Sequence, residues 1–324
     1  MGRRVLTVGV VLVLGLMPHP LRAEAGARAK NRIVFTSYRD SVTKAEVYVM
    51  NDDGSGVVRL TNDSFYAIQP APSPDGRQIA FITNRGDEQE LYIMGSDGSR
   101  QRSLSRSPEG LDLAPEWSPD GKRIAFTIAW PDQADVYVVN PDGSGLRNVT
   151  RTQNASEYSP TWTPDGRSLA FVRLNHTTQM GPRGIFRLDA SGKRLVRLTA
   201  GDDWDPQWSP DGTELAFTRF GSGDPLSEML TDIYVLDTRT SRVRNLTDTP
   251  YQTEYYPSWS PTGKTIAFGR DPDYVWRDDY PFGPSLPDVG GPLSAIHTID
   301  TDGANERMLT SGLGGDDSPS YMRR

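Results

Sequence analysis

Short apolar segments alternate with turn residues along most of the chain, and they recur in a fixed order. A unit holds an apolar triplet such as Ile124-Ala125-Phe126, a second segment such as Val136-Tyr137-Val138, and a closing pair such as Leu198-Thr199. The triplet occurs six times, at 33–35, 79–81, 124–126, 169–171, 215–217 and 266–268. Segments that are short, β-branched or aromatic and bounded by turn residues predict β-strands.

The polar positions predict the turns between these strands. Residues 115–121 read Pro-Glu-Trp-Ser-Pro-Asp-Gly, and close copies stand at 70–76, 160–166, 206–212 and 257–263. Proline presets φ at the second turn position, and glycine accepts the left-handed exit. The leading prolines, counting Pro319 of a truncated C-terminal copy, are 45, 45, 46, 51 and 62 residues apart.

Four strands per unit and a period near 45 residues predict an all-β fold, a six-bladed β-propeller of four-stranded antiparallel blades. The first unit begins at Ile33 with its second strand, and 316–321 is left over as an innermost strand. We therefore expect the C-terminal strand to complete the first blade and close the ring. The propeller domain is predicted at 33–324, after a short linker at 26–32.

Residues 1–25 have the pattern of a signal peptide. Arg3 and Arg4 precede an apolar stretch at 5–17, and Ala23-Glu24-Ala25 offers a small-x-small cleavage site. Thirteen apolar residues are short for a membrane helix, which needs ~20, although an uncleaved anchor is the alternative. The expected location is the periplasm or the exterior, without membrane insertion after cleavage.

Charge and composition exclude several classes of partner and site. The net charge is −7 and the pI is near 5.1, which disfavours nucleic acid because phosphate binding needs a basic surface. The chain has no cysteine, so disulfides, thiolate metal sites and a cysteine nucleophile are excluded. We expect no cofactor and a monomer.

The repeated unit, Pro-x-Trp-Ser-Pro-Asp-Gly followed by Ile-Ala-Phe, Ile-Tyr-Val and Leu-Thr, resembles the propeller repeat of the TolB family. The resemblance covers most of residues 33–322. It implies the propeller fold and a place in the bacterial envelope, where TolB is the periplasmic component of the Tol–Pal system. TolB has an α/β domain before its propeller, and we expect this chain to lack one.

The connection from the second to the third strand varies in length between units, whereas the Ser-Pro-Asp-Gly turn does not. It is longest in the last unit, where aromatic and charged residues alternate as in a recognition surface. We predict that a protein or peptide binds there, although a neutral insertion is the alternative. The candidate binding residues are Asp271, Asp273, Tyr274, Trp276, Arg277, Asp278, Asp279, Tyr280 and Phe282.

Acidic residues stand three positions before most of the repeat prolines. They begin the innermost strands, so we expect them near the channel mouth: Asp112, Glu157, Asp203, Glu254 and Asp316, with Ala67 as the exception. Carboxylates that converge repel one another unless their charge is neutralised. We expect neutralisation by the arginines that follow the triplets, which could bridge neighbouring blades, in preference to a bound metal ion. These arginines are Arg39, Arg85, Arg173, Arg219 and Arg270.

Catalytic signatures are scarce. His297 replaces an aromatic residue of the other units and is expected to be packed, and His176 has no partner nearby in sequence. No nucleophile elbow or phosphate-binding loop is present. The sequence favours a non-catalytic binding scaffold, and the alternative is a carboxylate- or metal-dependent hydrolase or lyase acting in the channel.

Overall fold

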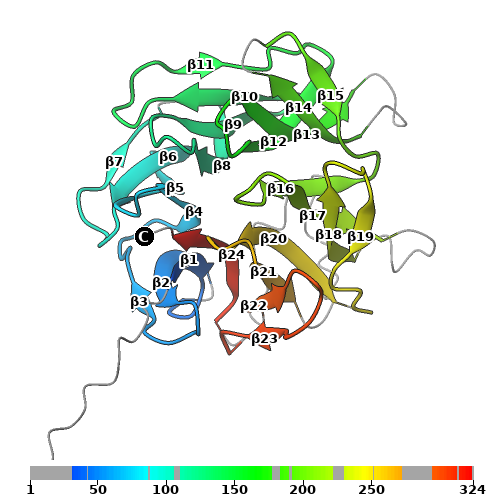
Figure 1. Ribbon diagram of the computed structural model, residues 1–324. Helices are drawn as coiled ribbons and strands as arrows, with labels where there is room; N and C mark the ends of the chain where they lie inside the picture. Colours follow the sequence, from blue (N-terminus) through cyan, green and yellow to red (C-terminus); the bar gives the residue numbers. More distant parts are fainter. Residues whose placement is uncertain are drawn as a thin grey trace, which may run out of the picture.

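A computed structural model describes residues 31–322, except 42, 87, 106–109, 177–182, 190–191, 222–229, 251, 272–293 and 312–313. The predicted signal peptide, 1–25, and most of the linker lie outside the described residues. The chain forms six four-stranded antiparallel sheets arranged in a ring, so the propeller prediction is confirmed (Figure 1). Among the described residues, no helix is long and apolar enough to cross a membrane.

The strands follow the repeat, each blade being built outward from the channel. Blade 1 combines β24 (Asp316–Met322), β1 (Arg32–Ser37), β2 (Glu46–Asn51) and β3 (Val58–Arg59). Blade 2 contains β4 (Ala67–Pro72), β5 (Gln78–Gly86), β6 (Glu88–Gly95) and β7 (Arg102–Ser103). Blade 3 contains β8 (Leu111–Trp117), β9 (Ile124–Trp130), β10 (Gln133–Val139) and β11 (Arg147–Asn148).

The last three blades have the same order. Blade 4 contains β12 (Ala155–Trp162), β13 (Ser168–Asn175), β14 (Gly184–Asp189) and β15 (Leu195–Arg197). Blade 5 contains β16 (Asp203–Trp208), β17 (Glu214–Phe220), β18 (Thr231–Asp237) and β19 (Val243–Asn245). Blade 6 contains β20 (Thr253–Trp259), β21 (Thr265–Asp271), β22 (Ala295–Asp300) and β23 (Arg307–Met308).

The C-terminal strand closes the ring as predicted. β24 is antiparallel to β1, with Ile33 opposite Tyr321 and Ser37 opposite Asp316. Figure 1 shows β24, in red, beside β1, in blue, so the two ends of the domain share one sheet. Blade 1 therefore depends on residues separated by almost the whole chain.

The core is repeated with the blades. The third triplet residue is a phenylalanine in every blade, and all six are fully buried: Phe35, Phe81, Phe126, Phe171, Phe217 and Phe268. Apolar clusters extend across blade boundaries, as where Ile82 of blade 2 packs in one cluster with Phe126 of blade 3. Because each sheet buries its faces against its neighbours, no blade has a core of its own.

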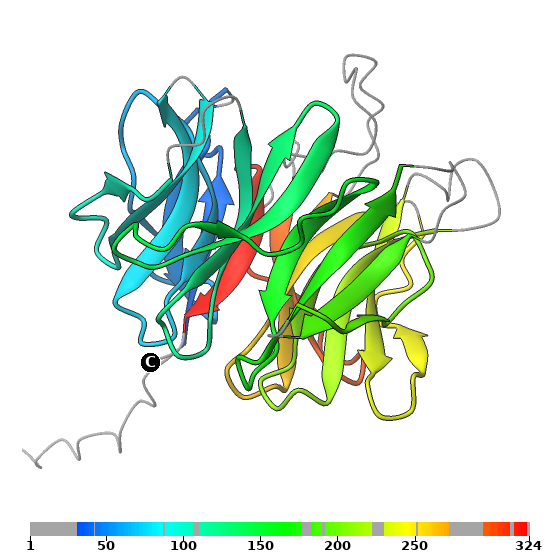
Figure 2. The same cartoon turned by 90° about the horizontal axis from the view of Figure 1, so that it is seen from above.

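The ring has two distinct ends (Figure 2). The turn face carries the Ser-Pro-Asp-Gly turns, whose glycines have φ between 66° and 74°, the left-handed region that only glycine enters at little cost. The loop face carries the connections between second and third strands, at 38–45, 87, 131–132, 176–183, 221–230 and 272–294. Blade 1 therefore has a longer connection than blades 2 and 3.

Candidate functional site

Four of the five acids that begin the innermost strands, all except Asp112, pair with arginines of the same blade. In the β-ladders Glu157 lies opposite Arg173, and Glu254 lies opposite Arg270. The salt bridges measure 3.5 Å for Glu157–Arg173, 2.6 Å for Asp203–Arg219, 2.7 Å for Glu254–Arg270 and 3.0 Å for Asp316–Arg39. The prediction that these arginines bridge neighbouring blades was wrong for these four pairs, because each arginine lies on or just after the strand adjacent to its acid in the same sheet. Arg85 instead contacts Asp63, in the connection from blade 1 to blade 2.

These acids are buried in the wall of the ring. Asp112, Glu157, Asp203, Glu254 and Asp316 are at most 1% exposed. Two cavities lie along the channel, and neither is lined by any of the five. Their carboxylates therefore meet groups inside and between the blades.

Hydroxyl groups from the end of the preceding blade reach the same acids. Asp112 accepts a hydrogen bond from Ser105 and another from the backbone N–H of Leu91, at 2.8 Å. Glu157 accepts from Thr152 at 2.7 Å, and Glu254 from Thr247 at 3.2 Å. Three of the five acids thus accept hydroxyl groups of the preceding blade, and two of these, Glu157 and Glu254, are also paired with an arginine of their own blade.

The closing Leu-Thr pair has a structural explanation. In all six blades, its hydroxyl oxygen accepts a backbone N–H from the first half or the middle of the third strand, 14 residues earlier in the chain. The six acceptors are Thr61, Ser105, Thr150, Thr199, Thr247 and Thr310, at 2.9–3.1 Å. A buried N–H without a partner is costly, so a small hydroxyl residue is required at this position.

Two blade junctions hold a second carboxylate. Asp135, at the start of β10, accepts a hydrogen bond from Thr150 at 2.8 Å, and its negative charge repels that of Glu157. Asp232, at the start of β18, likewise accepts a hydrogen bond from Thr247 and repels Glu254. Burial, assisted by this second acid, raises the pKa of Glu157 and of Glu254 to about 7, despite the arginines. Sequence reasoning missed both partners, although each precedes its acid by 22 residues.

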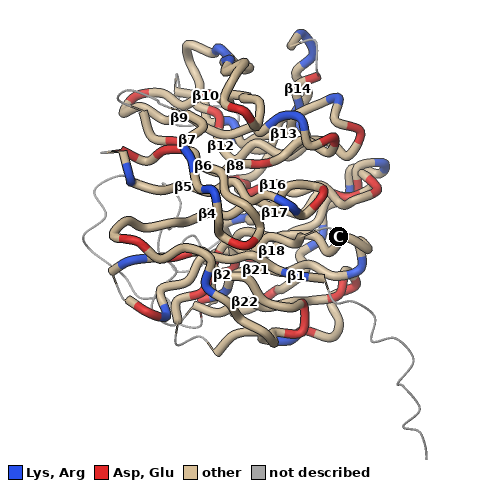
Figure 3. The backbone as a smooth tube through the Cα atoms, turned by 90° about the vertical axis from the view of Figure 1, so that its left-hand side faces the viewer, with Lys and Arg blue, Asp and Glu red and all other residues tan. Residues whose placement is uncertain are grey.

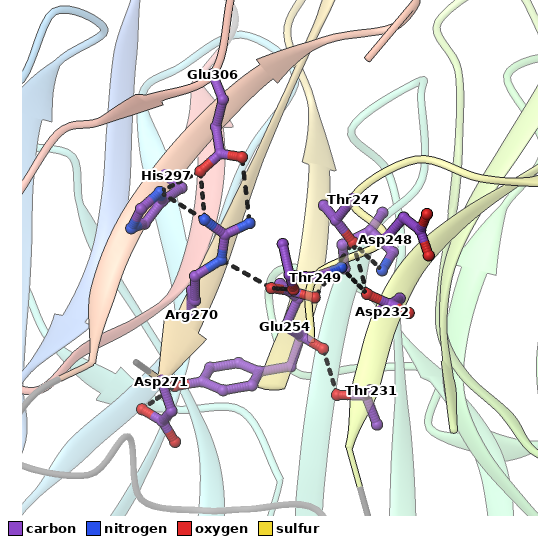
Figure 4. A network of polar contacts seen from close by, with 12 residues as sticks. Thr231, Asp232, Thr247, Asp248, Thr249, Glu254, Arg270, Asp271, His297 and Glu306 are labelled. Atoms are coloured by element: carbon purple, nitrogen blue, oxygen red, sulfur yellow. Dashed lines mark hydrogen bonds and ion pairs between the residues drawn. The ribbon is translucent and has the colours of Figure 1, made fainter. Parts of the chain in front are cut away.

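Blade 6 extends this arrangement outward (Figure 4). Arg270 is only 7% exposed and contacts Glu254 on one side and Glu306 on the other. Glu306 also lies 2.9 Å from Nδ1 of His297, whose pKa is lowered by burial and by the charge of Arg270. The ring of His297 lies 5.7 Å from that of Phe268, which gives this histidine a packing contact as well.

The channel is lined by a different ring of residues. Each innermost strand has a bulge, and the residue before its repeat proline has a φ of 47–53°: Gln69, Ala114, Ser159, Asp205, Tyr256 and Ser318. All six line one cavity of about 90 Å³. Asp205 accepts from Ser159 at 3.1 Å, and desolvation raises its pKa to about 7.

Of the predicted binding loop, only Asp271 belongs to the described residues. It ends β21, and its carboxylate accepts a hydrogen bond from Tyr255 at 3.0 Å. The other predicted binding residues lie outside the described residues: Asp273, Tyr274, Trp276, Arg277, Asp278, Asp279, Tyr280 and Phe282. On the same face, Nε2 of His176 lies 2.7 Å from the buried Ser156 hydroxyl, a partner that the sequence did not indicate.

Possible metal ligands do not cluster in the described part of the chain. Among the described residues, no group of three or more His, Cys, Asp or Glu side chains could hold a metal ion. The buried acids already have arginine or hydroxyl partners, which accounts for them structurally.

Charged residues of both signs are spread over the outer strands and turns (Figure 3).

Comparison with known proteins gives one family. The family model of the TolB β-propeller domain matches residues 23–275. Dipeptidyl-peptidase 5 of Porphyromonas endodontalis is 31% identical over 86 residues, which are 26% of this chain and 12% of that protein. The Tol-Pal system protein TolB of Anaeromyxobacter dehalogenans is 37% identical over 85 residues, 26% of this chain and 19% of that protein.

A solved structure extends the likeness over the whole ring. The crystal structure of TolB from Acinetobacter baumannii matches with a TM-score of 0.70 and 21% identity, covering 91% of this chain and 67% of that one. At this identity the match shows a common fold. The chain spans less than a fifth of the length of the two curated relatives.

Proposed function

The chain belongs to the TolB β-propeller domain family, and from that premise we propose that it is an exported, non-catalytic scaffold. On this proposal it binds a protein or peptide on its loop face, in the bacterial envelope or outside the cell. The observation that carries the proposal is the contrast between the two ends of the ring. The turn face repeats one turn, whereas the loop-face connections range from one residue at 87 to the segment 272–294.

Rigid scaffolds with variable loops at one end are a common basis for recognition. The strand ends at the loop face are held in place by ion pairs and hydrogen bonds between acids, arginines and hydroxyl groups. Because these polar groups are engaged with one another, their recurrence needs no catalytic explanation. The aromatic residues of the last connection are then the candidates for contact with a partner.

A capture experiment tests the proposal. The mature protein is immobilised and exposed to envelope extract, beside a variant with Tyr274, Trp276, Tyr280 and Phe282 changed to Ala. The matched control changes two exposed apolar residues to Ala: Leu146, just before β11, and Met308 on β23. We expect a saturable partner that the control retains and the loop variant loses. Equal recovery with both variants would contradict the assignment to this loop.

The competing enzymatic function has its own test. Purified protein is assayed with and without added divalent metal on peptide, glycoside and polyuronate substrates. Turnover that is lost on changing Asp205 to Asn, with the fold intact, would replace the scaffold proposal with a channel enzyme. Export is tested separately, by determining the mature N-terminus of protein recovered from the periplasmic fraction; cleavage after residue 25 is expected.

A further inference from the structure

The outer strands of the ring are polarised in charge. The hairpins β14–β15 of blade 4 and β18–β19 of blade 5 together contain seven Lys and Arg residues and three Asp residues. The equivalent hairpins of blades 1 and 6, β2–β3 and β22–β23, contain six acids and two Arg residues. In a chain of net charge −7, the rim of blades 4 and 5 is therefore locally basic.

The few acids of this rim are engaged with backbone groups. Asp189 accepts from the N–H groups of Lys193 and Arg194, and Asp237 accepts from those of Arg239 and Thr240. Arg194 and Arg242 are exposed, and within the described ranges neither forms a salt bridge. Arg244, by contrast, is paired with Glu214 at 3.0 Å. The rim thus presents cationic groups whose charge is not neutralised locally.

A groove lies between the same two blades. It has a volume of about 790 Å³, and its lining includes Arg197, Leu198, Phe220 and Val243. The one acid among the described residues of this lining, Asp202, is paired with Arg183 at 3.4 Å. Leu195 on β15 is 40% exposed and precedes Arg197 on the same strand. Because side chains two positions apart on a strand share a face, the apolar Leu195 and the basic Arg197 lie side by side.

The groove also borders a free strand edge. β15 is the outermost strand of blade 4, and among the described residues it pairs only with β14, through Leu195, Val196 and Arg197. Its other edge can accept an added strand, which is a general mode of peptide recognition. A partner that uses this edge must have a polypeptide backbone.

We propose that the groove between blades 4 and 5 binds an extended segment of a protein in which acidic and apolar residues alternate. The segment adds to the edge of β15, its carboxylates meet Arg194, Arg197 and Arg242, and its apolar side chains pack on Leu195 and Val243. This surface belongs to blades 4 and 5, whereas the connection at 272–294 joins two strands of blade 6, so the inference goes beyond the function proposed above. A membrane surface or an acidic polysaccharide could use the charge but neither the strand edge nor the apolar positions.

Fluorescence anisotropy with labelled peptides tests the inference. The probe is an extended peptide of alternating glutamate and valine, and the comparison peptide replaces glutamate with lysine. The test variant is Arg194→Glu/Arg242→Glu, and the matched control is Arg77→Glu/Arg100→Glu, which makes the same charge change at exposed positions on blade 2. We expect about tenfold weaker binding of the acidic peptide by the test variant, with the control within about twofold of the unmodified protein.

Three outcomes would overturn the proposal. The first is an equal loss of affinity in both variants, which would reduce the effect to net charge. The second is equal binding of the lysine peptide. The third is binding of phosphatidylglycerol vesicles or dextran sulfate, sensitive to the blade 4 and 5 changes, without binding of the acidic peptide. Thermal melts of each variant confirm that the compared proteins are folded.

Discussion

Glu254 and Arg270 lie directly opposite each other in the β20–β21 ladder, with 2.7 Å between carboxylate and guanidinium, and both are buried. The pKa of Glu254 is nevertheless raised to about 7, since burial outweighs the attraction of Arg270 and Asp232 adds repulsion. Glu157 has the same relation to Arg173 and Asp135. The junctions of blades 3–4 and 5–6 therefore favour a protonated acid.

The first prediction concerns pH. A carboxyl whose pKa is raised on folding stabilises the fold below its unfolded pKa, near 4.5, and loses this contribution as pH rises through about 7. Glu254→Gln should therefore gain stability relative to the unmodified protein between pH 5 and pH 8, by at most roughly 3 kcal/mol. Urea unfolding at the two pH values measures this change.

A matched control is Asp203→Asn. Asp203 has the same place in blade 5, but Gly184 stands where the second acid would be. Its substitution removes the ion pair with Arg219 and should destabilise the protein similarly at both pH values. A pH-independent effect of Glu254→Gln would contradict the account of the acid pair.

The second prediction concerns the closing hydroxyl of each blade. Thr199→Val keeps the shape of the side chain but leaves the buried N–H of Ile185 without its acceptor. We expect a loss of roughly 1–3 kcal/mol in the free energy of unfolding. Thr199→Ser should lose much less, because serine fills this position naturally in blade 2. Equal losses for Val and Ser would assign the effect to packing.

The third prediction concerns a glycine at a blade contact. Gly98 has a φ of +84°, and a Cβ there would lie 2.3 Å from the carbonyl oxygen of Leu60 in blade 1. Gly98→Ala should destabilise by more than the ~1 kcal/mol expected from the left-handed backbone alone. Gly192, at +69° with nothing within 4 Å of a Cβ, is the control. Thermal melts showing equal effects at both sites would argue against the contact.

The fourth prediction concerns closure of the ring. Removing 316–324 deletes β24, and with it the ladder to β1 and the salt bridge from Asp316 to Arg39. We expect the cooperative thermal transition to fall sharply or disappear, because blade 1 loses its innermost strand. Removing only 323–324 should leave it unchanged. An unaltered transition after the longer truncation would mean that the ring does not depend on β24.

The blades and their closure could be predicted from sequence because the signals are local. A triplet, a turn and a closing pair recur in order, and counting them leaves 316–321 as the missing strand of blade 1. The side of the innermost strand toward which each acid side chain points could not be predicted in this way. Glu157 and Pro160 are separated by a bulge at Ser159, with a φ of 48°, and this change of register is not encoded in the spacing.

The partners of the buried acids illustrate the same limit. The sequence places Glu157 and Arg173 in one repeat unit, but only the ladder shows that they lie directly opposite each other on β12 and β13. Asp135 precedes Glu157 by 22 residues, as Asp232 precedes Glu254, so a regular spacing was present in the sequence. It becomes meaningful once the third strand of one blade is placed beside the first strand of the next.

The central claim is that the recurrent acids hold the ring together while the loop face binds the partner. Measuring partner capture and thermal stability on the same two variants tests it most directly. The variant with Tyr274, Trp276, Tyr280 and Phe282 changed to Ala should lose capture and keep its melting temperature. Glu254→Gln should change stability and retain capture at a temperature where it is folded. Loss of capture by folded Glu254→Gln, together with full capture by the loop variant, would contradict the account.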